Sequence, residues 1–313
     1  MLSYLLRRLV YGFATVLGVL LLLYVLFFLY AEPGDIARRA LGEKAAPEAI
    51  AQWIRNHGYD RPAPRLLLDH YRRMLTFDFG RSDADDSPIA LRLRRGLGPT
   101  LALTLPVFAL GLLAATTLAL FVAYFRNTYI DRAGVALCVL GMSVSILLYI
   151  IGGQFLIGKV LRWFPISGFD PSPAVVLRFL ALPVLVGVAA GVGSDARFYR
   201  TVFVEESNRD YVRTARAKGC GDARIMVRHV LRNALIPLLT RAVMAIPLLF
   251  TGFILLESFF GIPGIGSLTV DAIQGNDFAT LRAVVFLGSL LFVLAQILTD
   301  VAYTLVDPRV RLS

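Results

Sequence analysis

Long apolar runs alternate with polar segments along most of the chain, and this alternation is typical of a bundle of membrane-spanning helices. A helix needs about 20 mostly apolar residues to cross the hydrocarbon core of a bilayer. Six runs approach or exceed this length, at residues 9–31, 100–125, 133–158, 174–194, 236–256 and 283–305. The pattern therefore predicts an all-α polytopic membrane protein with six transmembrane helices.

The first run, residues 9–31, has a cleaved signal peptide as its alternative interpretation. Such a peptide has an apolar core of only about 7–15 residues, with small residues before the cleavage site. This run is longer, and Leu29 and Tyr30 interrupt the small-residue pattern. We therefore expect a retained first span.

The long polar segment at residues 32–98 follows the first run, and two short helices are predicted in it, at residues 47–56 and 65–75. Its many arginines do not place it in the cytoplasm, because the charge rule governs loops shorter than about 60 residues. We divide the chain into residues 1–98, the first span with a long extracytoplasmic segment, and residues 99–313, a five-helix core.

Arg178 and several glycines interrupt the fourth run, so the distribution of charge decides whether it crosses the membrane. Six crossings from a cytoplasmic N-terminus leave the basic segments at 126–132 and 195–235 and the basic C-terminal tail in the cytoplasm. Omitting the fourth crossing would export the strongly basic segment 195–235, against the positive-inside rule. We keep six crossings with both termini cytoplasmic.

Composition supports the membrane interpretation. Of the 313 residues, 57% are hydrophobic and 17% are charged, whereas soluble domains are about half apolar and a quarter charged. The formal net charge is +10, but the basic residues cluster beside apolar runs and are not interleaved with aromatic residues. The charge therefore indicates retained cytoplasmic loops and not nucleic-acid binding.

The basic segment at 195–235 contains the clearest candidate functional pattern. Arg209, Arg213 and Arg216 share one helical face, because residues three and four positions apart are neighbours on a helix. Val212 and Ala215 fall on the opposite side. This pattern predicts a short helix with a basic exposed face.

The ends of this helix also carry signals. Ser207 is a candidate N-terminal cap, and Asp210 places a carboxylate in the first turn. Gly219 stands where a helix commonly ends in the left-handed conformation. Beyond Gly221, Asp222 is a candidate cap for a second helix with a stripe of Arg224, Arg228 and Arg232. Two short helices joined by a glycine turn predict a docking elbow for a soluble partner.

The same residues resemble the EAA coupling loop of ABC-importer permeases. The resemblance rests on Arg-Thr-Ala-Arg-Ala-Lys-Gly at 213–219 and on Leu-Arg-Asn-Ala-Leu-Ile-Pro at 231–237. The motif at 213–219 is similar to that of the peptide and nickel branch, which has Arg at the first position, here Arg213, where other branches have Glu. It implies an ATPase-coupling site made of Asp210, Arg213, Thr214, Ala215, Arg216, Ala217, Lys218, Gly219 and Pro237.

A second resemblance lies between the last two runs, where residues 257–266 read Glu-Ser-Phe-Phe-Gly-Ile-Pro-Gly-Ile-Gly. Helix-breaking residues are tolerated at membrane depth only where protein or water shields the backbone. The segment is either an outer loop or a partly inserted segment at the mouth of the translocation path, and Glu257 either faces that path or is solvated among the headgroups. The candidate residues of this outer mouth are Glu257, Pro263, Gly264 and Gly266.

Shorter pieces extend the resemblance over nearly the whole chain, at residues 58–62, 78–82, 164–168 and 307–309. The resemblance implies the permease subunit of an ABC importer in a bacterial or archaeal plasma (inner) membrane. Its implied partners are a second permease in a heterodimer, two ATPase subunits and an extracytoplasmic binding protein. Peptides are the implied cargo, and nickel or another small solute is the alternative.

An intramembrane enzyme and a secondary transporter are the alternative function classes. A serine nucleophile needs a base within hydrogen-bond reach, but no histidine occurs in an apolar run, so Ser143 and Ser145 are expected to pack helices. The interiors of the apolar runs carry almost no charged residues that could couple transport to an ion. The sequence also lacks the Gly-rich loop that would bind the phosphates of ATP. The energy must then come from a separate ATPase.

No catalytic, metal or cofactor site is predicted. The three histidines, His57, His70 and His229, lack ligand spacing. Cys138 lies in an apolar run and Cys220 in the basic elbow, so no disulfide is expected.

Overall fold

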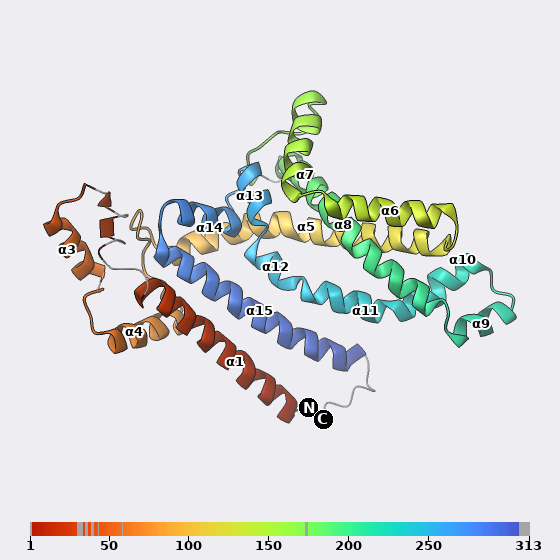
Figure 1. The fold of residues 1–313 in the computed structure, drawn as a ribbon, viewed down its shortest axis with the longest axis horizontal. Helices are drawn as coiled ribbons and strands as arrows, with labels where there is room; N and C mark the ends of the chain where they lie inside the picture. Colours follow the sequence, from red (N-terminus) through yellow and green to blue (C-terminus); the bar gives the residue numbers. More distant parts are fainter. Residues whose placement is uncertain are drawn as a thin grey trace. The chain divides into compact units, whose positions relative to one another are not determined.

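The computed structural model describes residues 2–29, 34, 37–38, 41–42, 44–57, 59–172 and 175–306, most of which form helices (Figure 1). Within these ranges there is no strand, only an isolated bridge between Arg81 and Pro88. The predicted all-α class is therefore confirmed.

The chain divides into two compact units. Unit 1 comprises Met1–Thr100, Phe250–Ile254 and Pro263–Ser313, and unit 2 comprises Leu101–Leu249 and Leu255–Ile262. The boundary at Thr100 lies close to the division expected at residues 98 and 99, but the C-terminal part of the chain groups with unit 1.

Four segments of the described chain are each long and apolar enough to cross a membrane: Leu6–Phe28, Ile89–Tyr124, Val176–Glu206 and Phe278–Leu298. Two helix pairs meet the same test together, Tyr129–Ser143 with Ile146–Val160 and Ile254–Phe260 with Ile265–Gln274. The protein thus has four to six candidate spans, with six reached when each pair counts as one. A polytopic membrane fold is confirmed, although two of the predicted spans are built differently from expectation.

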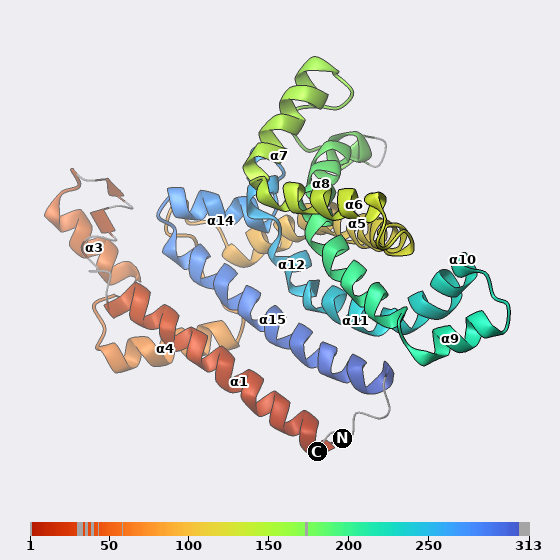
Figure 2. The ribbon, with the colours of Figure 1, turned by 45° about the vertical axis from the view of Figure 1, so that its right-hand side comes forward.

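In unit 1 the helices α1 (Leu2–Tyr24) and α15 (Phe278–Val306) run side by side (Figures 1 and 2). A π-helical turn, η1 (Val25–Leu29), continues α1. Val16, Leu20 and Phe286 are buried in the core between them. A Cβ at Gly12 would lie 2.6 Å from Val293 Cγ1, so glycine permits the close approach of the two helices.

The polar segment of unit 1 contains α3 (Pro47–His57) and α4 (Ala63–Leu75), which confirms both predicted helices. Glu32 and Gly58, which the sequence interpretation also placed in this segment, lie outside the described residues.

The helix α5 (Ile89–Tyr124) begins eleven residues before the predicted start of the second span. Its first turns are polar on one side and bury Ile89, Leu93 and Gly96 on the other. An apolar-run criterion does not detect an amphipathic beginning of this kind, so the start predicted at residue 100 was wrong.

The predicted third span is broken in unit 2. It consists of α6 (Tyr129–Ser143), α7 (Ile146–Gly153) and the π-helical η2 (Gln154–Val160), with a 90° bend at the break. Val144 is extended, and Ser145 Oγ accepts a hydrogen bond from Leu147 N as the cap of α7. Because Ser143 and Ser145 are both exposed, their predicted role in helix packing was wrong.

The fourth span belongs to α8 (Val176–Glu206), which continues twelve residues beyond the predicted end at Ser194. Residues 195–206 are therefore part of a long helix and not of the elbow. The helix crosses α6 closely at Gly193, where a Cβ would lie 2.8 Å from Cys138 O.

The predicted fifth span, residues 236–256, is divided among α11 (Leu231–Met244), α12 (Ile246–Thr251) and α13 (Ile254–Phe260). The helix is interrupted at Ala245 and again at Gly252, whose φ of +77° is incompatible with a continuing helix. A further helix, α14 (Ile265–Gln274), precedes α15. The prediction of a single fifth helix was therefore wrong. The helix of the sixth span starts at Phe278, and not at residue 283 as predicted.

Candidate functional site

The predicted basic helix is present as α9 (Asp210–Ala217). Val212 and Ala215 are buried, whereas Arg213, Arg216 and the capping Lys218 are exposed. The remaining predicted residues Asp210, Thr214 and Ala217 are exposed as well. The predicted buried and exposed faces of this helix are therefore confirmed.

The end of α9 has the geometry of a Schellman motif. Gly219 has a φ of +80°, the left-handed conformation expected from sequence. Its N–H donates to Arg216 O at 3.0 Å, and Cys220 N–H donates to Ala215 O at 3.2 Å. Two terminal carbonyls are thereby satisfied, and the chain reverses within a few residues.

Both predicted caps of the elbow were wrong. The residue preceding α9 is Arg209, without a capping hydrogen bond, and Ser207 instead ends α8 by donating to Val204 O at 2.8 Å. Asp222 is the first residue of α10 (Asp222–Arg224), one position after the cap, and its carboxylate accepts from Arg216 Nη2 at 2.9 Å. Asp222 therefore links the two arms of the elbow.

The second arm is longer than expected. From α10 the chain continues through the π-helical η3 (Ile225–Val230) directly into α11 (Figure 1). The stripe of Arg224, Arg228 and Arg232 is exposed along it, as predicted. Pro237 is half-buried inside α11, one turn beyond the buried Ala234. Movement of the elbow would thus act on α11 without an intervening loop.

The elbow rests on one apolar core in unit 2. Val212 and Ala215 of α9 and Ile225, Met226 and Val230 of η3 share this core with residues of four longer helices: Ala115, Ala119 and Ala123 of α5, Cys138 of α6, Ala196, Tyr199 and Phe203 of α8, and Ala234 and Leu238 of α11. The buried face of α9 therefore packs in the same core as α5, α6, α8 and α11.

Beside this core, a hollow of about 290 Å³ opens between the end of α5 and the elbow. Tyr124, Arg126, Arg216 and Asp222 line it, together with Met226. Arg126, Arg216 and Asp222 give this hollow charged lining groups, whereas the buried Met226 is apolar.

Sequence reasoning missed the polar contacts that tie the 126–132 loop to the elbow. Arg126 Nη1 donates to Ser207 Oγ at 3.0 Å and to Asn208 Oδ1 at 2.8 Å, where α8 leads into α9. Tyr211 Oη donates to Glu206 Oε2 at 2.9 Å across the same junction. The basic character of the loop was recognised from sequence, but not its partner.

A second missed feature is the bidentate ion pair of Asp131 on α6 with Arg200 on α8. Both oxygens of Asp131 accept from Arg200 at 2.6 Å, and the side chain of Asp131 is only 8% exposed. Asn127 N–H also donates to this carboxylate, at 3.0 Å. No signal in the sequence pointed to this pair, because Asp131 falls in the basic loop predicted at 126–132 and Arg200 in the basic segment at 195–235.

Of the outer-mouth candidates, Glu257 belongs to unit 2, and Pro263, Gly264 and Gly266 belong to unit 1. Glu257 of α13 is completely buried in unit 2, so it is not solvated. The helix is held by two contacts from the predicted outer turn and its preceding helix: Gly168 N–H donates to Phe260 O at 2.8 Å, and Gln154 Nε2 donates to Phe259 O at 2.9 Å.

In unit 1, Gly264 and Gly266 are buried at the start of α14 and Pro263 is exposed. A Cβ at Gly96 of α5 would lie 3.2 Å from Gly264 C, so the two backbones are in close contact. Thr100 Oγ1 accepts from Ile265 N at 2.8 Å. Glycine at this place serves the packing of α14 on α5.

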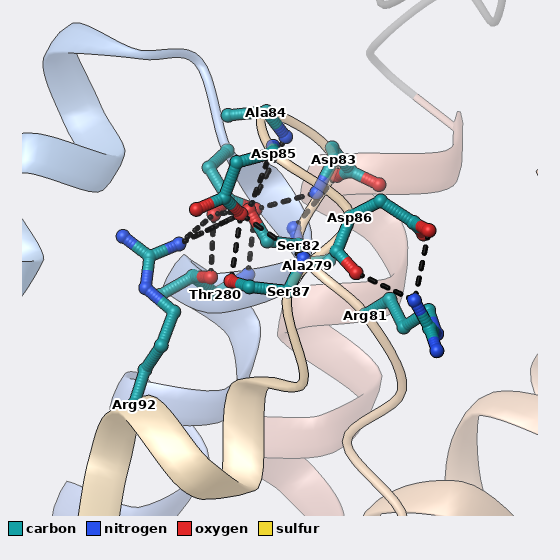
Figure 3. Close-up of polar contacts among 11 residues, drawn as sticks. Arg81, Ser82, Asp83, Ala84, Asp85, Asp86, Ser87, Arg92, Ala279 and Thr280 are labelled. Atoms are coloured by element: carbon teal, nitrogen blue, oxygen red, sulfur yellow. Dashed lines mark hydrogen bonds and ion pairs between the residues drawn. The ribbon is translucent and has the colours of Figure 1, made fainter. Parts of the chain in front are cut away.

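A buried polar cluster joins the 81–87 loop to the start of α15 in unit 1 (Figure 3). Asp277, 2% exposed, accepts from Ser82 Oγ at 2.6 Å, from Thr280 Oγ1 at 2.5 Å and from Arg92 Nη1 at 3.2 Å. Hydrogen bonds from Ser87 and Ser82 lower the pKa of the neighbouring Asp85 to about 2. The cluster keeps this loop acidic and fixed against α15.

No group of three or more His, Cys, Asp or Glu residues with metal-binding geometry occurs in the part of the chain that the structure describes. Cys138 is a buried free cysteine and Cys220 a half-buried one. The tail residues Asp307, Pro308 and Arg309, which the family resemblance also used, lie outside the described ranges.

Two family models match the chain. Residues 115–312 match the family described as "Binding-protein-dependent transport system inner membrane component", and residues 1–87 match its N-terminal membrane-component family. The first match contains the elbow and the segment at 257–266, and the second contains α1, α3 and α4.

Individual relatives cover nearly the whole length. A protein of Brucella abortus (strain 2308) named "Putative peptide transport system permease protein" is 33% identical over 303 residues, which are 95% of this chain and 96% of that protein. A "Glutathione transport system permease protein" of Salmonella typhimurium is 33% identical over 319 residues, 99% of each chain. The corresponding protein of Pectobacterium atrosepticum is 32% identical over 311 residues, again 99% of each. The chain therefore belongs to the family of multi-pass inner-membrane permease components of binding-protein-dependent transport systems.

Proposed function

We propose that this chain is one of two permease subunits of an ATP-driven peptide importer, and that its elbow receives a cytoplasmic ATPase subunit. A second, different permease forms the other half of the translocation path in this proposal. Two ATPase subunits and an extracytoplasmic binding protein complete the complex. The N- and C-termini and the elbow lie in the cytoplasm, and the polar segment with α3 and α4 lies outside.

The observation that carries the proposal is the construction of α9. It exposes Arg213, Arg216 and Lys218 while burying Val212 and Ala215 in a core shared with α5, α6, α8 and α11. Exposed ion pairs contribute little stability, typically about 0–1 kcal/mol. These cations are therefore available to a partner, and the core beneath them couples the partner's movement to the long helices.

Two polar ties extend this coupling in the proposal. Arg126 links the α5–α6 loop to the entry of α9, and the Asp131–Arg200 pair fixes α6 against α8. Interhelical contacts of this kind let α6, α8 and α9 move as one body. Asp131 and Arg200 act as positioning residues and do not touch the ATPase.

ATP hydrolysis is assigned to the partner subunits. The sequence has no Gly-rich loop ending in Lys-Ser or Lys-Thr, which would be needed to bind the nucleotide phosphates. A docking elbow on a chain without a nucleotide site is consistent with energy supplied by a separate protein.

Peptides are proposed as cargo because the relatives carry names of peptide and glutathione permeases over nearly the full length of the chain. The outer mouth of the path is assigned to Glu257, Pro263, Gly264 and Gly266. The buried carboxylate of Glu257 supports a function for this segment, because an ionisable group beside a membrane span is costly to retain.

A pair of glycine substitutions tests the coupling. Gly219→Val places a β-branched residue at a φ of +80°, whereas Gly221→Val affects a glycine two residues away with a φ of −66°. Neither added Cβ meets an atom within 4 Å, so the backbone conformation alone distinguishes the two sites. The left-handed conformation costs a β-branched residue about 1–2 kcal/mol or more.

Peptide uptake is measured in proteoliposomes that contain both permeases, the ATPases and the binding protein. We expect Gly219→Val to lose most of the uptake while inserting normally into the membrane, and Gly221→Val to retain it. Wild-type uptake by Gly219→Val would show that this turn does not set the coupling geometry. ATP hydrolysis by the rigorously purified single chain would refute the assignment of that activity to its partners.

A further inference from the structure

Unit 1 contains a cavity of about 710 Å³ that the coupling function does not use. Its walls come from η1, α3, α4, the 78–86 loop and the start of α15. The volume is within the range of small-molecule sites, about 300–1,000 Å³. The acidic loop of Figure 3, including Asp83 and Asp85, forms part of the wall.

One wall of the cavity holds a buried cation. Arg282 of α15 is 8% exposed, and its Nε and Nη1 have no hydrogen-bond partner. Its Nη2 lies 3.5 Å from Tyr59 Oη, and its guanidinium carbon lies 4.5 Å from the centre of the Phe28 ring. A ring face and one long hydrogen bond leave most of the five guanidinium donors unsatisfied.

Two described carboxylates of unit 1 that act on the neighbouring Tyr59, Asp83 and Asp277, have other hydrogen-bond partners. Asp83, on the same cavity, accepts from Ala279 N at 2.8 Å. Asp277 is bonded to Ser82, Thr280 and Arg92. Among the described residues, Arg282 has no ion pair. Burying a cation without an anionic partner is costly, so Arg282 is a candidate binding group for an anion.

A neutral acceptor lies on the same cavity. His70 of α4 is 5% exposed, and its Nε2 has no hydrogen-bond partner. Burial, reinforced by the Arg282 charge, lowers the pKa of His70 to about 4. The imidazole is therefore neutral near pH 7, and the second nitrogen is engaged with the backbone of Leu20, which leaves Nε2 as an acceptor.

Aromatic rings supply the apolar surface. Trp53 and Tyr59 stack with their centroids 5.6 Å apart, and Phe28 lies 5.3 Å from Tyr59. All three rings line the cavity. Rings of this kind present flat apolar area at low entropic cost, which suits small side chains and planar amide groups.

We propose that this cavity binds the carboxylate end of a short peptide, with Arg282 donating to the carboxylate, His70 Nε2 accepting from a peptide N–H, and Phe28 and Trp53 packing against its side chains. The guanidinium matches a carboxylate in charge and in its forked geometry. That the carboxylate belongs to a peptide rests on the proposed function. The site would then hold cargo on the outer side, within the permease itself.

The test measures binding by the purified full chain in lipid nanodiscs. In a Trp163→Phe background, Trp53 is the only remaining one of the two tryptophans, so its fluorescence reports on the cavity. The probes are trialanine and trialanine amide, which differ only in the C-terminal charge, and calorimetry records the heat of each titration. We expect saturable binding of the free acid and, because hydrogen bonds to charged groups are the stronger ones, about tenfold or more weaker binding of the amide.

Two variants locate the charge that is responsible. Arg282→Gln should abolish the preference for the acid over the amide. Arg81→Gln removes an equal charge from the rim of the same cavity, where the side chain is 63% exposed, and should retain the preference. If Arg282→Gln fails to fold, the comparison of acid and amide on the wild-type chain still decides the question.

Equal binding of acid and amide, or no saturable heat with either probe, would overturn the proposal. Peptide uptake by the complete importer separates this failure from that of the proposed function. Normal uptake without binding by the permease would reject the cavity and keep the importer. A clear preference for the acid in a complex that transports no peptide would keep the cavity and reject peptide import.

Discussion

The elbow of unit 2 and the cavity of unit 1 both present guanidinium groups, but they hold them in opposite ways. The side chains of Arg213 and Arg216 are 79% and 61% exposed and form exposed ion pairs with Asp210 at 3.6 Å and with Asp222 at 2.9 Å. Arg282 is buried between Phe28 and Tyr59 and has no ion pair among the described residues. An exposed charge costs little stability and remains free to pair with a partner protein. A buried charge, in contrast, needs an opposite charge from the fold or from a ligand.

The Asp131–Arg200 pair is the third case, a buried charge that is matched internally, and breaking it should have the largest effect on stability. Asp131→Ala leaves Arg200 without its bidentate partner, and such losses cost about 3–5 kcal/mol. The matched control is Asp210→Ala, whose carboxylate is 96% exposed and should cost less than about 1 kcal/mol.

Denaturant titration of both variants in detergent micelles measures these free energies of unfolding. Similar losses for Asp131→Ala and Asp210→Ala would show that burial does not distinguish the two carboxylates. The comparison between exposed and buried charges would then fail.

The buried His70 predicts a pH dependence of the stability of unit 1. Its pKa falls from 6.5 in the unfolded chain to about 4 in the folded protein, because burial and then Arg282 disfavour the imidazolium. Below pH 6.5 the unfolded chain binds a proton that the folded protein does not, so stability falls with decreasing pH until about pH 4. At 1.36 kcal/mol per pH unit the loss is about 3 kcal/mol.

Unfolding midpoints are measured between pH 7 and pH 4 for wild type and for His70→Phe. The difference between the two curves separates the contribution of His70 from the contributions of the carboxylates. The variant should lose less stability than wild type over the same interval. Parallel curves would mean that His70 is protonated equally in both states, and its neutral role on the cavity would be wrong.

The smallest effect on stability is expected for the exposed arginines of the elbow. Arg213→Ala should change the free energy of unfolding by no more than about 0.5 kcal/mol, since its pair with Asp210 is 3.6 Å long and solvated. It should nevertheless weaken co-purification of the ATPase subunits. Unchanged ATPase binding would remove Arg213 from the docking face.

The parts of the fold that the sequence predicted correctly depend on local signals. The face of α9 follows from the spacing of Val212 and Ala215, and the turn follows from Gly219. The helices α3 and α4 carry equally local patterns. Boundaries failed where hydropathy does not decide: burial of one face starts α5 at Ile89, and backbone conformation breaks the predicted fifth span at Ala245 and Gly252.

Two of the missed features involve partners that are distant in sequence. Asp131 and Arg200 are 69 residues apart, and Arg282 and Tyr59 are 223 residues apart. Single residues of these types carry no pattern until the helices are assembled. Arg200 and Arg282 both lie just outside the predicted apolar runs, so neither stood out in the sequence as a charge that needs a partner.

The most direct test of the central claim uses Cys220, which is half-buried in the turn after Gly219, while Cys138 is buried and serves as a silent site. A membrane-impermeant maleimide should label Cys220 in inside-out vesicles and miss it in right-side-out vesicles. Added ATPase subunits should slow that labelling, and Cys220→Ser should abolish the signal. Labelling from the outer side would contradict the proposed topology, and labelling that the ATPase leaves unchanged would contradict docking at this elbow.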